Sequence, residues 1–112
     1  MSHPLFSGTP PSFAELYENT LVPTLFRPCA ERLLERLQIK PGERLLDVAT
    51  GTGIVARMAK ERVGSAGVVV GVDLSPVMLG GARSIAPAID WREGNAAALP
   101  VTDGETFDVV TC

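Results

Sequence analysis

The sequence predicts an α/β fold, a doubly wound parallel sheet with a pair of helices at its N-terminal end. Three observations support this class. Short apolar runs of strand length alternate with amphipathic segments of helical length, as expected for strands joined by crossover helices. The run Val68–Val72 is β-branched and nearly continuous, which is typical of a parallel strand buried on both faces. A glycine-rich turn follows the first apolar run and leads into a helix.

The N-terminal part predicts a flexible arm and then two helices. Residues 1–11 hold three prolines, a glycine and two serines, which favours a loose segment. Ser12 and Glu15 match a capping box, so a short helix is expected from about 13 to 21, with Pro23 discouraging its continuation. A second helix of about 12–14 residues is expected from apolar side chains at helical spacing, namely Phe26, Ala30, Leu33, Leu34 and Leu37.

After a turn at 40–43, strands and helices alternate. Four strands are expected, at residues 44–48, 68–72, 88–92 and 107–111. The helix between the first two is expected at about 54–62, with Gly64 as its C-terminal cap. The next helix is expected to begin at Pro76 with Ser75 as its N-cap, and to stop at Pro87. Right-handed crossovers then favour the strand order 3-2-1-4, with helices on both faces of the sheet.

The sequence stops on the expected fourth strand. A strand at an open sheet edge exposes a row of unpaired amides and carbonyls. We therefore expect these 112 residues to be the front part of a larger, truncated doubly wound domain, with association between copies through the open edge.

Composition and charge disfavour several classes of function. The net charge is −3 and the ten basic residues are scattered, which disfavours binding to nucleic acid through a basic surface. The two cysteines, Cys29 and Cys112, form no disulfide framework, and with the single histidine, His3, they predict no metal site. No apolar run approaches a membrane span, and the start lacks the features of a signal peptide. A cytoplasmic protein without membrane association is the expectation.

Three polar groups fall at the ends of successive expected strands. Asp47 precedes a turn that carries Gly51 and Gly53, and glycines there let a ligand lie against bare backbone. Asp73 ends the second strand, where a carboxylate can accept hydrogen bonds from both hydroxyls of a ribose. Asn95 follows the third strand, where its amide could bind an adenine edge. In an open parallel sheet, the crevice at these strand ends is where ligands bind.

In these residues the sequence resembles the class I S-adenosylmethionine-dependent methyltransferases, in particular the ubiquinone/menaquinone C-methyltransferase-like group. The resemblance covers residues 12–112, the cofactor-binding half of that Rossmann-like fold, so 12–112 is expected to be a partial S-adenosylmethionine-binding domain. Asn95 stands where the family usually has Asp, and altered donor binding is expected from that change. The resemblance implies donor contacts from ten residues, namely Tyr17, Asp47, Ala49, Gly51, Thr52, Gly53, Asp73, Leu74, Asn95 and Ala96.

The resemblance also implies a role for several of these side chains. Asp47 would face the cationic amino group of the donor, Asp73 would hold its ribose, and Tyr17 would close over its methionine end. S-adenosylmethionine carries its own activation as a sulfonium, so the protein's main task is to hold donor and acceptor in line. The product is S-adenosylhomocysteine, and the acceptor is expected to be a small molecule that the sequence does not identify.

Two alternatives stay open. Gly51, Gly53 and Ala56 match a dinucleotide fingerprint with an acid 20 residues further on, as in an NAD(P)-binding Rossmann module. Three features disfavour this alternative. Asp47 lies inside the first strand, two helices precede that strand, and the loop after the third strand has no role in such a module. The other alternative is a catalytically inactive truncated fragment, because the residues that receive the methyl group in this family normally lie beyond the fourth strand.

Overall fold

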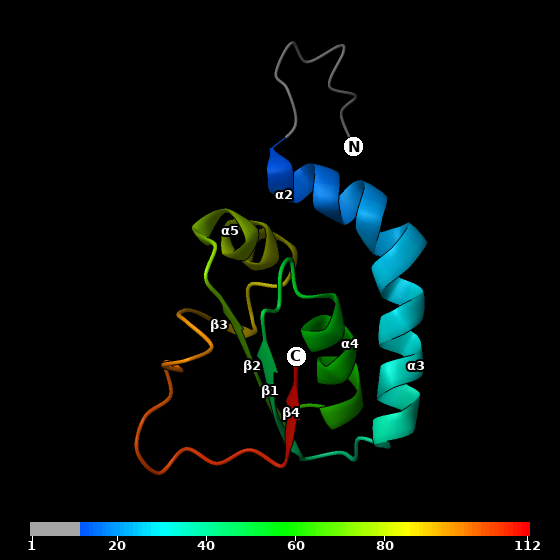
Figure 1. Ribbon diagram of the computed structural model, residues 1–112. Coiled ribbons are helices and arrows are strands. Elements are labelled where there is room, and N and C mark those ends of the chain that lie inside the picture. Colours follow the sequence, from blue (N-terminus) through cyan, green and yellow to red (C-terminus); the bar gives the residue numbers. More distant parts are fainter. Residues whose placement is uncertain (1–11) are drawn as a thin grey trace.

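The computed structural model describes residues 12–112 as one parallel sheet with helices packed against it (Figure 1). The arm expected at residues 1–11, including His3, lies outside the described residues. The strands are β1 (Arg44–Val48), β2 (Val68–Asp73), β3 (Asp90–Glu93) and β4 (Val109–Thr111). Their order is β3-β2-β1-β4 and every pairing is parallel, which confirms the predicted topology.

The N-terminal helices form one unbroken helical run. It consists of α2 (Phe13–Leu16), the π-helix η1 (Tyr17–Phe26) and α3 (Arg27–Leu37), and it bends before descending alongside α4 (Figure 1). The capping box is confirmed, since Ser12 and Glu15 exchange hydrogen bonds of 3.1 and 3.2 Å. The expected end of the helix at Pro23 is wrong. Pro23 lies inside η1, whose i to i−5 bonds avoid the i−4 carbonyl that a proline ring meets in an α-helix.

The central elements agree closely with expectation, and the last two strands are shorter than predicted. Helices α4 (Ile54–Val63) and α5 (Pro76–Ile85) are capped by Gly64 and Ser75 as predicted. The third strand begins only at Asp90, because the Ile89 N–H donates to the Ala86 carbonyl and closes a turn. The fourth strand begins at Val109. Just before it, the Arg44 N–H donates to the Asp108 side-chain carboxylate at 2.8 Å, whereas a strand pairing would use a backbone carbonyl as the acceptor.

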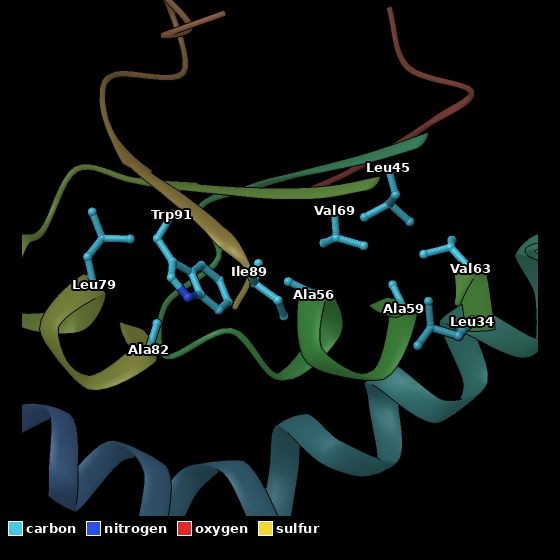
Figure 2. Packing of buried hydrophobic residues seen from close by; sticks show 10 residues of the cluster. All are labelled: Leu34, Leu45, Ala56, Ala59, Val63, Val69, Leu79, Ala82, Ile89 and Trp91. Atoms are coloured by element: carbon cyan, nitrogen blue, oxygen red, sulfur yellow. The ribbon is translucent and has the colours of Figure 1, made fainter. Parts of the chain in front are cut away.

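The larger hydrophobic core lies between the sheet and the helices. Figure 2 shows side chains of β1, β2 and β3 pointing toward α4 and α5, with Leu34 of α3 joining from beyond α4. Trp91 of β3 is the largest side chain there, and its indole N–H donates to the Ala86 carbonyl at 2.8 Å. Its ring occupies the space where a side chain at Gly71 would lie, since a Cβ there would be 2.4 Å from Trp91 Cζ3.

The opposite face of the sheet is covered by a loop. The buried side chains there belong to β1 and β2, and Leu99 and Phe107 pack against them. Both come from the segment 94–108, which crosses from β3 to β4. Over residues 12–112, helices therefore cover one face and not both as expected, because the turns in this crossing segment replace the helix that would lie there.

Residues 12–112 contain neither a membrane-spanning helix nor a cluster of metal-binding side chains. None of the helices in this range combines the length and the apolar character needed to cross a bilayer. No three side chains of the types His, Cys, Asp or Glu gather there in a way that could hold a metal ion.

An ion pair between β3 and the crossing segment gives the fold a predictable response to acid. Arg92 contacts Glu105 through two hydrogen bonds, of 2.7 and 2.8 Å. The Arg92 guanidinium, aided by the Thr102 N–H, lowers the pKa of Glu105 from 4.5 to about 2. A depressed pKa contributes stability that is present above about pH 4.5 and is lost as the pH falls toward 2.

We therefore expect Glu105→Gln to lower the free energy of unfolding at neutral pH, and to lower it less as the pH falls from 4.5 to 2. The effect is small because solvent screens the pair. Urea unfolding at a series of pH values measures it, with exposed Asp103→Asn as the control. A difference between wild type and Glu105→Gln that stays constant across this pH range would contradict the assignment.

Candidate functional site

The site is built on the turn that joins β1 to α4. Three residues of this turn have left-handed backbone, with φ of +58° at Ala49, +63° at Gly51 and +92° at Gly53. The Thr50 N–H donates to the Val72 carbonyl at 2.9 Å, which fixes the turn to the end of β2. The turn thus lies at the carboxyl end of the sheet, where the sequence predicted a ligand crevice.

Asp73 links the glycine turn to the start of α5. Its carboxylate accepts hydrogen bonds from the Gly51 N–H at 2.8 Å and from the Ser75 N–H at 2.9 Å. The residue is half-buried. Each carboxylate oxygen accepts one backbone bond and retains a second lone pair, so the group can also accept bonds from a ligand.

Asp47 lies beneath the turn and is buried. Its two oxygens accept hydrogen bonds from the hydroxyls of Thr50 and Thr111, each at 2.7 Å. The β1–β4 register pairs Asp47 with Thr111, which explains this contact across the sheet. Burial raises the pKa of Asp47 above its ordinary value, the two hydroxyls partly offset this, and the nearby Asp73 carboxylate adds to it. A cation placed beside Asp47 would favour its charged form.

Two cavities meet at Ala49. The first, here named the strand-end cavity, has a volume of about 200 Å³. It is lined by Val48, Ala49, Val72, Asp73, Leu74, Gly94, Asn95 and Ala96. The second, the helix-side cavity, measures about 290 Å³ and lies between the helical run and the end of β1. Its lining includes Tyr17, Phe26, Cys29, Ala30, Leu33, Asp47, Ala49, Thr50, Ile54, Val55 and Cys112.

A larger cavity, of about 390 Å³, lies between α5 on one side and α2 with the start of η1, including Glu18, on the other. It contains none of the ten predicted site residues, and small or apolar side chains of α5 form one wall. Size alone therefore does not identify the site. The two smaller cavities are lined by most of the predicted residues and lie at the carboxyl end of the sheet.

The glycine turn is enclosed by two aromatic rings. A Cβ built at Gly51 would lie 2.9 Å from the hydroxyl of Tyr17. A Cβ built at Gly53 would lie 2.3 Å from Trp91 Cη2. The Tyr17 ring stacks on Phe26 with 5.2 Å between centroids. Burial raises the pKa of Tyr17, and the carboxylates of Asp73, Glu18 and Asp47 raise it further. The Tyr17 hydroxyl therefore stays protonated at neutral pH.

The structure gathers most of the predicted site residues around the two cavities. Seven of the ten line one cavity or the other, namely Tyr17, Asp47, Ala49, Asp73, Leu74, Asn95 and Ala96. Asn95 accepts a bond from the Ala97 N–H at 2.9 Å, which stabilises its own turn. Gly51, Thr52 and Gly53 lie in the turn between the two rings and line neither cavity. Thr52 is fully buried and its hydroxyl donates to Glu18.

Sequence reasoning missed the partners of the turn. Glu18 accepts from the Thr52 hydroxyl at 2.9 Å and forms an ion pair with Arg57 of α4. The contact to Thr52 joins residues 34 apart in the sequence, and the ion pair joins residues 39 apart. No local spacing signals contacts of this kind.

Comparisons with known proteins give one family and several relatives. A family model described as a methyltransferase domain matches residues 45–112. The ubiquinone/menaquinone biosynthesis C-methyltransferase UbiE of Xanthomonas oryzae is 44% identical over 80 residues, which cover 66% of this chain and 31% of that protein. The nocamycin O-methyltransferase of Saccharothrix syringae is 40% identical over 103 residues, covering 88% of this chain and 36% of that protein.

The fold has a counterpart among solved structures. A SAM-dependent methyltransferase from Aquifex aeolicus superposes with a TM-score of 0.60 at 24% identity, covering 72% of this chain and 45% of that one. At this identity the likeness shows the fold alone. The chain spans about a third of the length of the two relatives compared above.

Proposed function

This chain belongs to the methyltransferase domain family, and from that membership we propose that the full protein transfers a methyl group from S-adenosylmethionine to a small molecule. Residues 12–112 supply the donor-binding part, as a partial domain. The single observation that carries the proposal is the junction at Ala49, where Asp73 borders one cavity and Asp47 borders the other. An elongated donor with a ribose near one end and an ammonium group at the other fits this arrangement.

The strand-end cavity suits the adenosine part of the donor. Asp73 accepts hydrogen bonds from the two ribose hydroxyls with its remaining lone pairs. Exposed Leu74 and Ala96 provide apolar surface for the adenine ring, and Asn95 borders the same space. The ten predicted donor contacts, including the backbone of Gly51, Thr52 and Gly53, remain part of this proposal.

The helix-side cavity suits the methionine part. Asp47 faces the ammonium group, directly or through a water, and the cation would offset the burial that raises the pKa of this carboxyl. Tyr17 closes the cavity with its ring and supplies a protonated hydroxyl. Bound S-adenosylmethionine supplies an activated methyl group, and these residues hold it in a fixed place, which is the main contribution that the protein has to make.

A small acceptor is supported by the relatives. The two curated relatives described above are named as a C- and an O-methyltransferase. Pairing between copies through the β4 edge also remains a proposal.

Calorimetric titration of the 112-residue chain tests donor binding. We expect S-adenosylhomocysteine to bind with a micromolar Kd and NADP to give no heat above dilution. Binding of NADP alone would replace the proposal with a dinucleotide-binding module. If neither ligand binds, this chain is not a self-sufficient donor site.

A further inference from the structure

The side chain of Glu18 joins three parts of the molecule at one carboxylate oxygen. Glu18 lies in the π-helix η1, and its Oε1 accepts from the Thr52 hydroxyl at 2.9 Å. The same oxygen accepts from Arg57 Nη2 of α4. One acid therefore holds the helical run, the glycine turn and the first turn of α4 together.

This cluster is partly buried. The side chains of Arg57 and Glu18 are only 16% and 21% exposed, and Thr52 is fully buried. The Nε of Arg57 is buried with no hydrogen-bond partner among the residues that the structure describes. Glu18 is thus the acid that compensates the charge of the Arg57 guanidinium. A partly desolvated pair of this kind is stronger than a surface pair.

The neighbour of Glu18 in the chain is the ring that covers the turn. Tyr17 begins η1 and lies against Gly51, one residue before Thr52. Fixing Glu18 to Thr52 and Arg57 therefore fixes where the Tyr17 ring lies over the turn. η1 is also held by apolar contacts, since Val22 is buried and Tyr17 and Phe26 pack around it, whereas Glu18 supplies its polar contact to the glycine turn.

We propose that Glu18 is a positioning residue for the donor site. Its contacts to Thr52 and Arg57, here named the latch, fix the helical run to the glycine turn and so place the Tyr17 ring. This inference rests on the proposed function, because the position of the Tyr17 ring matters only if a ligand occupies the helix-side cavity. The competing explanation is an ordinary ion pair between helices, which adds stability and has no separate effect on binding.

The test combines two substitutions at Glu18 with one at Tyr17. Glu18→Ala removes the latch, and Glu18→Gln keeps an oxygen acceptor for Thr52 but loses the charge for Arg57. Glu31→Gln, exposed on α3, is the matched control. Affinity for S-adenosylhomocysteine is measured by calorimetry in each variant, and again after adding Tyr17→Ala. Hydrogen exchange of the backbone amides of residues 17–26 is measured without ligand.

Networked residues couple by amounts that correspond to about a tenfold change in affinity. We expect Glu18→Ala to weaken binding by about tenfold, Glu18→Gln by less, and the control not at all. Tyr17→Ala is expected to weaken binding about tenfold in wild type but less than about twofold in Glu18→Ala, because the ring is already misplaced. Amide exchange in η1 is expected to quicken about tenfold in Glu18→Ala.

Each outcome supports or overturns the latch. If the effects of Glu18→Ala and Tyr17→Ala multiply, Glu18 does not act through Tyr17 and the inference fails. Unchanged exchange in η1 also overturns it. If Glu18→Ala does not fold, Glu18→Gln carries the same comparison. If wild type binds no S-adenosylhomocysteine, this chain is not a self-sufficient donor site, while the exchange measurement still decides whether Glu18 holds the helical run.

Discussion

Asp73→Ala is expected to weaken the binding of S-adenosylhomocysteine by about 100-fold, because a hydrogen bond to a charged group contributes about 1.5–3 kcal/mol and two ribose hydroxyls are involved. The substitution also frees the Gly51 N–H, which donates to Asp73 at 2.8 Å and helps to fix the turn. Both effects act in the same direction on affinity. Calorimetric titration with S-adenosylhomocysteine measures the change.

Two further variants separate ligand contact from support of the turn. Asp73→Asn keeps an oxygen for one backbone N–H but loses the charge, so an intermediate affinity is expected. Asp103→Ala removes an exposed acid from the crossing segment and is expected to leave affinity unchanged. An affinity within twofold of wild type in Asp73→Ala would show that this carboxylate does not hold the ribose.

Gly53→Ala is expected to lower the free energy of unfolding by about 3 kcal/mol, the sum of left-handed strain and overpacking of a core. The residue has φ of +92°, which an L side chain rarely adopts, and its Cβ would lie 2.3 Å from Trp91 Cη2. Trp91 cannot yield easily, since it is 7% exposed and its indole N–H is bonded to Ala86. Urea unfolding followed by circular dichroism measures the loss.

The matched control is Gly80→Ala on α5. No atom lies within 4 Å of a Cβ built there, and the residue is exposed within the helix. Replacing glycine by alanine in a helix interior is expected to stabilise the protein by about 0.5–1 kcal/mol. Equal effects of the two substitutions would contradict the packing of Trp91 against the turn.

The sheet and its order could be predicted because their signals are local. The β-branched run of β2, the apolar run of β1 and the turn residues between them need no distant partner to be recognised. Ser75 and Gly64 cap their helices through bonds to residues three or four positions away. Strand order then follows from the handedness of crossovers, which is nearly constant among proteins.

The remaining features depend on contacts across the fold. Pro23 predicts a helix end, and the structure continues through it in a π-helix because Val22 and Ala30 bury their side chains with Ile54 of α4. The latch at Glu18 joins segments that share no sequence pattern. The bonds of Asp47 depend on a strand register that only pairing with β4 defines.

The two rings that enclose the glycine turn are the protein's only tyrosine and only tryptophan. The chain therefore carries a natural donor–acceptor pair for resonance energy transfer, with Tyr17 on the helical run and Trp91 fixed in the core. Trp91 emission, compared between excitation where both side chains absorb and excitation where only tryptophan absorbs, reports the separation of the run from the sheet without any attached label. A change in this separation on ligand binding or on unfolding can thus be followed in the unmodified protein by its own ultraviolet fluorescence.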